Sequence, residues 1–292
     1  MVMGILEQGL IYGILALGLL ITYRILDFPD LTVDSSFPLG AAISAILTTQ
    51  GMNPLLTLVF ATLCGALAGL VTGFIHVKLR VRDLLSGIIT MTGLYSINLA
   101  IAGKANVPLF AGDTLFRNDF TKNVLPEALR PYATLGIVLI IVVAAKVLLD
   151  LYLKTKAGYL LRAAGDNPAV VTVLAKDQGS VKIVGLMIAN ALVSLSGAVL
   201  CQQQRFFDIS MGTGTMVIGL ASVIIGTNLF KNVSFLRSTT AVILGSVLYK
   251  ACVSIAISLG LDSQYMKLVT AVLFLAILVG SNFQRKKVRI HA

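Results

Sequence analysis

Long runs of apolar residues alternate with short polar stretches along the whole chain. A membrane-spanning helix needs about 20 mainly apolar residues, and nine runs approach that length. They are Gly4–Ile25, Leu31–Thr49, Pro54–Lys78, Leu84–Ala102, Tyr132–Tyr152, Ile183–Gln203, Gly214–Phe230, Ser238–Leu259 and Met266–Asn282. The pattern therefore predicts an all-α, polytopic transmembrane helix bundle of about nine spans, within a range of eight to ten. We expect a single transmembrane domain over residues 1–292.

The second run begins with a polar segment. The segment Asp30–Ser36, DLTVDSS, stands directly before apolar residues that include Pro38. A carboxylate at the membrane centre costs about 2.5–3.5 kcal/mol, and hydroxyl side chains can satisfy backbone groups near a proline kink. We expect a broken second span in which Asp34, Ser35 and Ser36 line a translocation pathway. The alternative is that Asp30 only caps this span at the membrane surface.

Lys250 falls near the middle of the run Ser238–Leu259. An ammonium inside a membrane faces protein, water or a counter-charge. The counter-charges that the sequence offers are Asp34 and Glu7. Lys250 is thus expected either in a structural ion pair or on the pathway. The alternative, a side chain that reaches the interface, is hard to achieve about ten residues from either end of the run.

Small polar residues recur at helical spacing on two other runs. Ser86 and Thr90 share a helix face, as do Thr92 and Ser96, and we expect them to form interhelical hydrogen bonds. Asn190 and Ser194 also share a face, for which we expect a place on the pathway. That face leads to a polar cluster at the end of the run: Gln202, Gln203, Gln204 and Arg205.

Glycines are spaced so that helices can approach closely. Two overlapping GxxxG units are formed by Gly65, Gly69 and Gly73, and another by Gly9 and Gly13. Such faces permit close backbone contact in lipid, and packing inside one subunit is the expected use of most of them. Three further glycines recur every seven residues and predict a left-handed crossing: Gly212, Gly219 and Gly226.

Composition narrows the class of protein. Hydrophobic residues make up 57% of the chain and charged residues 12%, whereas a soluble domain is about one-quarter charged. The net charge of +10 would suit nucleic acid, but the charges stand in short loops and in the tail. Sixteen of the 23 Lys and Arg residues fall on one side of the nine spans, the side that carries the C-terminal tail. The positive-inside rule places that side, with the C-terminus, in the cytoplasm.

Metal and catalytic signatures are missing from the sequence. Cys64, Cys201 and Cys252 are isolated in or beside apolar runs, and His76 and His291 are too few for a histidine-built metal site. There is no GxxxxGK[ST] motif to cradle a nucleotide, and no HExxH or GxSxG. We expect neither catalytic nor metal-binding residues, no cofactor on this chain and no enzymatic activity.

The most polar internal stretch is Lys154–Lys182, KTKAGYLLRAAGDNPAVVTVLAKDQGSVK. Asn167 can cap a helix whose first residue is Pro168, and the residues after it predict a short, mostly apolar helix. Such a helix can dock on a soluble partner or lie on lipid. The residues expected to form the docking surface are Gly165, Asp166, Asn167, Pro168, Val170, Val171 and Leu174.

Two of these stretches resemble a known family. GYLLRAAGDNPAVVTVLA, followed by a span containing Gly197, is similar to the cytoplasmic coupling segment of ABC importer permeases of the branched-chain amino acid/ribose type. The segment Asp30–Ala41 resembles the polar break near that family's first span. In more detail the chain resembles the subgroup that carries aromatic or other hydrophobic amino acids.

The resemblance implies a function and a set of partners. It implies the permease subunit of an importer in the bacterial plasma membrane, acting as a homodimer in the lipid bilayer. It also implies two separate ABC ATPase subunits, which hold ATP and Mg, and an extracytoplasmic substrate-binding protein that meets Gln203, Gln204 and Arg205. An amino acid is the first expectation for the substrate, and a sugar or nucleoside the second. A stand-alone ion-coupled transporter, with Asp34 and Lys250 as a relay, is the alternative from another class.

Overall fold

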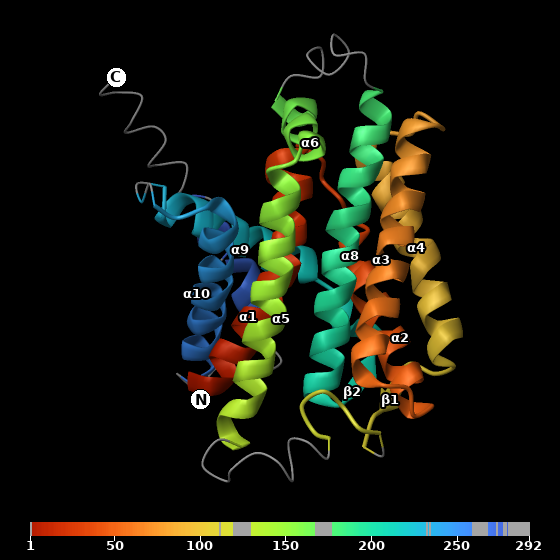
Figure 1. The fold of residues 1–292 in the computed structure, drawn as a ribbon, viewed down its shortest axis with the longest axis vertical. Coiled ribbons are helices and arrows are strands. Elements are labelled where there is room, and N and C mark those ends of the chain that lie inside the picture. The colour runs from red at the N-terminus through yellow and green to blue at the C-terminus, as the bar shows by residue number, and fades with distance from the viewer. Residues whose placement is uncertain are drawn as a thin grey trace.

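The computed structural model describes residues 2–110, 112–118, 130–166, 177–231, 233, 235–258, 268–272, 274–276 and 279. Within them the chain is a bundle of long helices (Figure 1). The helices are α1 (Val2–Leu19), α2 (Val33–Thr49), α3 (Pro54–Val77), α4 (Asp83–Ala102), α5 (Arg130–Leu153), α6 (Lys156–Asp166), α8 (Gln178–Gln204), α9 (Thr215–Leu229) and α10 (Ser238–Ser258). Two short strands, β1 (Asn106–Pro108) and β2 (Phe206–Asp208), pair antiparallel.

Seven helical segments of the described part are long and apolar enough to cross a membrane. They match seven of the nine expected runs, with ends that differ by at most five residues. The expected second span is the 17-residue α2. The expected ninth, 266–282, lies mostly outside the described residues. The all-α, multi-pass bundle therefore stands, whereas the count of nine spans is not confirmed.

The expected break in the second span is wrong. Helix α2 begins at Val33 and continues through Pro38 to Thr49. Pro38 lies in the second turn, where it removes only the backbone hydrogen bond to the Asp34 carbonyl, so the helix survives. The irregular backbone lies earlier, between Asp27 and Thr32. It follows a π-helical segment, η1 (Leu20–Ile25), which continues α1.

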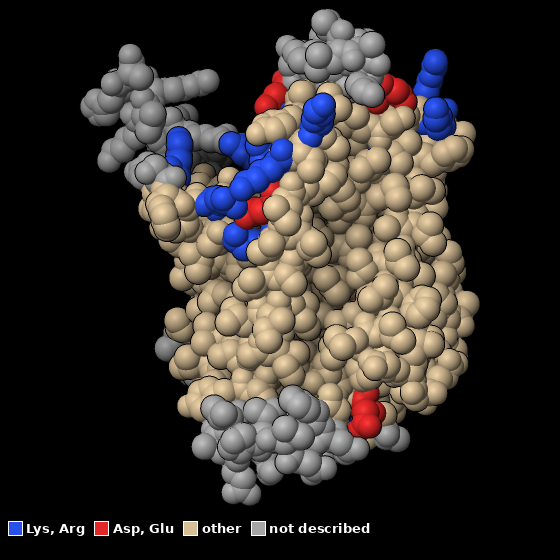
Figure 2. Space-filling view, in the orientation of Figure 1, with Lys and Arg blue, Asp and Glu red and all other residues tan. Residues whose placement is uncertain are grey.

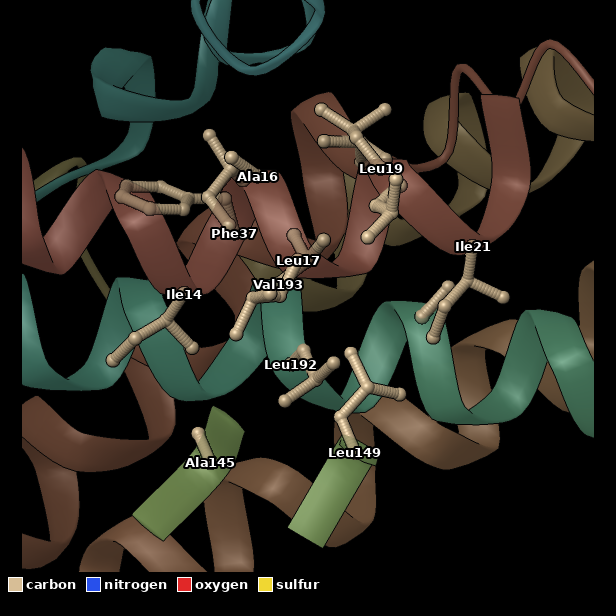
Figure 3. Packing of buried hydrophobic residues seen from close by; sticks show 14 of the residues in the cluster. Ile14, Ala16, Leu17, Leu19, Ile21, Phe37, Ala145, Leu149, Leu192 and Val193 are labelled. Carbon is tan, nitrogen blue, oxygen red and sulfur yellow. The ribbon is translucent and has the colours of Figure 1, made fainter. Parts of the chain in front are cut away.

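The core lies where α1, α2, α5 and α8 meet (Figure 3). Ile14 and Leu17 of α1, Phe37 of α2 and Val193 of α8 are fully buried there. Apolar side chains on the outer faces of α3, α4 and α5 are widely exposed instead. This inside-out distribution suits lipid, in which helices associate through close packing and hydrogen bonds and not through the hydrophobic effect.

Most of the glycine faces pack within the subunit, as predicted. A Cβ at Gly69 would come within 2.2 Å of the Leu186 carbonyl oxygen of α8, and one at Gly9 within 2.8 Å of Val247 Cα of α10. The prediction of one crossing for the seven-residue repeat is wrong. Its glycines contact three different helices, because Gly212 precedes α9 and meets α2, while Gly219 meets α1 and Gly226 meets α10.

Candidate functional site

Asp34 joins α2 to the first turn of α9. Its carboxylate accepts hydrogen bonds from the Gly214 N–H (3.2 Å), the Thr215 hydroxyl (3.1 Å) and the Met216 N–H (2.8 Å). Gly214 has φ of +85°, which favours glycine. A carboxylate at a helix N-terminus satisfies free N–H groups and opposes the positive end of the helix dipole. Asp34 therefore holds α9 against α2 while staying half-buried.

Helix α9 is short for a membrane helix. Its 15 residues span about 22 Å at 1.5 Å per residue, against a hydrocarbon core of about 30 Å. The 3₁₀ turn η3 (Ile209–Gly212) and β2 complete the passage to the end of the bundle that carries the strands. At the start of α9, irregular backbone therefore lies next to the half-buried carboxylate of Asp34. Irregular backbone beside a helix start is typical of binding sites in transporters.

Asp30 lies in a separate, fully buried hydrogen-bonded cluster. Its carboxylate accepts from the Thr32 N–H (2.9 Å) and from the Asn190 side-chain amide of α8 (2.8 Å). The Ser36 hydroxyl donates to Asn190 Oδ1 (2.7 Å), and the Thr32 and Thr72 hydroxyls are 2.8 Å apart. Asp30 thus forms a turn before α2 and ties it to α8, a larger role than surface capping. A buried carboxylate needs such partners because its desolvation is costly.

Two more residues of the predicted pathway connect helices. The Ser35 hydroxyl donates to the Met91 carbonyl of α4 (2.8 Å), and the Ser194 hydroxyl donates to the Ala61 carbonyl of α3 (2.7 Å). Ser35 is 5% exposed, and Ser36, Asn190 and Ser194 are not exposed at all. In this subunit Asp34 and Lys250 are the half-buried members of the predicted set. The pathway role of the whole set stays a prediction.

Three hydroxyls of α4 do not form the interhelical hydrogen bonds that were predicted for them. Ser86, Thr90 and Thr92 donate to the Asp83, Ser86 and Ile88 carbonyls of their own helix. A hydroxyl within a helix commonly donates to the backbone carbonyl three or four residues earlier in the same helix. Helix α4 is instead tied to α2 by Asn98, whose amide donates to the Ser35 carbonyl (2.9 Å).

Lys250 of α10 lies over an aromatic ring. Its ammonium nitrogen is 4.9 Å from the centroid of Tyr12, which is stacked on Phe37 at 6.0 Å. The expected ion pair with Asp34 or Glu7 is not formed. Asp34 is engaged by α9, and Glu7 accepts a hydrogen bond from Gln203 (3.1 Å). Tyr12 and Phe37 were not among the predicted site residues, because the proximity of α1, α2 and α10 is visible only in the tertiary structure.

The polar cluster at the end of α8 anchors a loop at the end of the bundle opposite α6 (Figure 1). Gln202 is fully buried, donates to Ser44 and Thr57, and accepts from the Leu115 N–H (3.1 Å). Arg205 ends α8 with φ of +62° and donates to the Phe110 carbonyl (2.7 Å). Gln203 is held by Glu7, and Gln204 is the last residue of α8.

The described part of the stretch expected to dock a partner lies at the other end, in α6 (Figure 1). Gly165 and Asp166 are the last residues of α6, directly before the helix expected to start at Pro168. A Cβ at Gly165 would come within 1.7 Å of the Ile25 carbonyl oxygen, so α6 packs directly on η1. The rest of the predicted docking surface, 167–176, lies outside the described residues.

Charges frame the bundle at its ends. On the face in Figure 2, a broad band without charged side chains separates the α6 end, where basic residues gather, from the opposite end. At the α6 end Asp150 of α5 is paired with Lys146 (2.8 Å) and Arg237 (3.0 Å), and it accepts a hydrogen bond from Thr239 (2.7 Å). This cluster was not among the predicted site residues, although the i, i+4 spacing of Lys146 and Asp150 in the sequence indicates such a pair.

Helix α8 has a charged cap at the same end. Asp177 accepts hydrogen bonds from the Gly179 and Ser180 N–H groups and from the Ser180 hydroxyl. The Ser180 hydroxyl, together with these N–H groups, lowers the pKa of the Asp177 carboxyl. For metals, the described residues hold no group of three or more His, Cys, Asp or Glu side chains that could bind an ion.

Comparisons with known proteins give the family. Residues 1–278 match the model of the family described as branched-chain amino acid transport system / permease component. The chain is 45% identical to a tyrosine transport system permease protein of Clostridioides difficile, over 96% of this chain and 91% of that one. It is 26% identical to the ribose import permease protein RbsC of Escherichia coli, over 96% and 85%. It is 29% identical to the nucleoside ABC transporter permease protein NupC of Lactococcus lactis, over 64% and 63%. No solved structure matches the chain.

A multi-pass helix bundle in which a helix starts on a half-buried carboxylate is typical of membrane transport proteins. The chain belongs to the branched-chain amino acid permease family of ABC transport systems. It is therefore a transport subunit, which sets aside the stand-alone ion-coupled carrier.

Proposed function

We propose that this permease imports an aromatic amino acid, with tyrosine as the first substrate to test. The observation that carries the proposal is the 45% identity to a tyrosine transport system permease over 96% of this chain. The ribose and nucleoside permeases are similar at 26% and 29% identity, which makes a sugar or a nucleoside the runner-up.

The subunit works, in this proposal, as one of two copies that form the pathway. Two ABC ATPase chains bind ATP and Mg at the cytoplasmic face and dock on the segment Gly165–Lys176. The packing of Gly165 on η1 supports this arrangement, because movement at the docking segment would reach α1 and the segment that leads to Asp30. An extracytoplasmic binding protein delivers substrate near Gln203, Gln204 and Arg205.

The orientation follows from the charges. The α6 end carries most of the described Lys and Arg side chains, including Arg24, Arg82, Lys154 and Lys182. By the positive-inside rule this supports a cytoplasmic position for that end. The basic residues of the tail, among them Arg285, support the same side for the C-terminus. The C-terminus is then cytoplasmic, and β1 and β2 lie on the outer face of the plasma membrane.

Uptake by the complete transporter tests the substrate. The permease is produced with its ATPase and binding protein in cells that lack other tyrosine uptake systems, and entry of labelled L-tyrosine is measured. We expect uptake that needs the permease and a competent ATPase, and that unlabelled L-phenylalanine reduces more than ribose or uridine does. Uptake of ribose or uridine without uptake of tyrosine would instead favour the runner-up.

A further inference from the structure

Lys250 carries a charge within a membrane helix, and no carboxylate among the described residues pairs with it. It stands 12 residues after the start of α10 and eight before its end, in a candidate membrane span. In the described part of the chain the Lys and Arg ion pairs are those of Asp150. Because an unpaired ammonium is costly inside a bilayer, the position needs a partner from outside the described residues or a wet cavity.

The carboxylates that the sequence offered to Lys250 are engaged elsewhere. Asp34 accepts three hydrogen bonds from the start of α9, and Glu7 accepts one from Gln203. A shift of Asp34 toward Lys250 would leave the Gly214 and Met216 N–H groups without this acceptor, and a shift of Glu7 would do the same to the Gln203 amide. The ammonium therefore stays available.

The ring of Tyr12 holds the Lys250 ammonium in a defined position. Its ring lies nearly parallel to that of Phe37, with 4° between the planes, and Phe37 is fully buried. Tyr12 and Lys250 are half-buried, so the contact lies at the edge of the packed core. A cation over an aromatic face is held less strongly than a cation bonded to a carboxylate. An arriving carboxylate can consequently draw the ammonium from the ring.

We propose that Lys250 is a specificity-determining residue of the translocation pathway, whose ammonium pairs with the carboxylate of the transported solute. Tyr12, held in place by Phe37, keeps the ammonium in position between solutes. The inference rests on the proposed function and deepens it, since it selects a carboxylate-bearing solute over a neutral sugar or nucleoside.

The proposed role of Lys250 predicts how its removal affects the stability of the permease. A structural ion pair would make removal of Lys250 destabilising. The ammonium has no such partner among the described residues, so Lys250→Met strands none of their charges. We expect Lys250→Met to unfold at the wild-type temperature or above it, while transport falls.

The first experiment separates recognition from structure. The full transporter is reconstituted in proteoliposomes with wild-type permease, Lys250→Met, Lys250→Arg, or the matched control Lys154→Met, whose side chain is exposed. We expect Lys250→Met to lower initial L-tyrosine uptake by about tenfold or more, as for the loss of a charge-assisted hydrogen bond. Lys250→Arg should retain most of the uptake, and Lys154→Met should match wild type. The melting temperature of each purified permease is measured in parallel.

The second experiment restores the charge chemically. Lys250→Cys is made in a background in which Cys64, Cys201 and Cys252 are replaced by alanine. Reaction with 2-aminoethyl methanethiosulfonate forms a mixed disulfide, expels the sulfinate and places an ammonium near the original position. We expect this reagent to restore uptake, and methyl methanethiosulfonate, which adds no charge, to restore none.

The outcomes separate the two proposals. If wild-type permease takes up no L-tyrosine, the proposed substrate is wrong. If wild-type uptake is intact and Lys250→Met matches it, recognition by Lys250 is overturned. A lower melting temperature in Lys250→Met, or equal rescue by both reagents, would also overturn it and assign Lys250 a structural or space-filling role.

Discussion

At the scale of single residues, two aspartates four positions apart have different roles. Asp30 is fully buried and ties the start of α2 to Asn190 of α8, whereas Asp34 is half-buried and caps α9. Both sit where backbone leaves regular structure, and both oxygens of each carboxylate are hydrogen-bonded. Of the two, Asp34 is the residue through which a structural change in the pathway could alter the start of α9.

We predict that the Asp34 cap stabilises the permease. Asp34→Leu should lower the free energy of unfolding by about 2 kcal/mol, the upper end for a lost cap with its dipole interaction. Asp34→Asn should cost less, because its amide oxygen can still accept from the Met216 N–H. Thermal unfolding of purified protein measures both, with Asp113→Ala as control because Asp113 is exposed. An Asp34→Leu variant as stable as wild type would show that α9 does not depend on this cap.

At the scale of helices, glycines on neighbouring elements serve different purposes. A Cβ at Gly65 of α3 would come within 2.3 Å of Ser194 Cβ, whereas one at Gly93 of α4 would meet nothing within 4 Å. Gly93 lines an apolar groove of about 450 Å³ between α3 and α4, with Leu67 and Ile97. The two positions therefore form a matched pair for testing close packing.

We predict opposite effects of alanine at these two glycines. Gly65→Ala should destabilise the permease by about 1–3 kcal/mol, because α3 and α8 must move apart. Gly93→Ala should be neutral or stabilising by up to about 1 kcal/mol, because alanine favours the helix and finds open space. Thermal unfolding of the two variants side by side measures this. A Gly65→Ala variant as stable as wild type would mean that α3 and α8 are not packed as closely as described.

The docking segment gives a prediction at the same scale. Asp166→Lys combined with Val171→Asp should uncouple transport by more than about tenfold, because it reverses a charge and places another on the expected apolar surface. The amount of permease in the membrane should not change. Co-purification of the ATPase and uptake are the measurements, and Lys104→Asp at the opposite end of the bundle is the control. Full ATPase assembly and uptake in the double variant would contradict docking at this segment.

At the scale of the whole molecule, the two ends of the bundle differ in charge and in architecture. Basic side chains gather at the α6 end, and the other end carries the β1–β2 pair and the loop held by Gln202 (Figures 1 and 2). In a membrane this asymmetry sets the direction of insertion. It also separates the proposed ATPase-facing end from the proposed end for the binding protein.

The orientation can be measured in whole cells. In a background without Cys64, Cys201 and Cys252, we predict that Lys104→Cys reacts with a membrane-impermeant maleimide in intact cells. Lys156→Cys should react only after the cells are permeabilised. Both lysines are exposed in the structure, so burial does not decide the outcome. The reverse pattern of labelling would invert the proposed topology.

The sequence by itself determined the class of fold and most span positions. Seven expected runs appear as helices long enough to cross a membrane. A bilayer requires long apolar segments whose backbone groups are satisfied internally, and both features can be read from the local sequence. GxxxG spacing likewise indicated close packing inside the subunit. The family was also recognisable from the segment around Gly165, since a motif is a local feature.

The partners of polar side chains were decided only by the tertiary structure. Asn190 with Asp30, Asp34 with the start of α9, and Lys250 over Tyr12 each join residues more than 150 positions apart. Helical periodicity tells which residues share a face of one helix, but not which helix that face meets. The expected pair of Lys250 and Asp34 was wrong for that reason, because three donors at the α9 start already engage Asp34 and Tyr12 holds the ammonium.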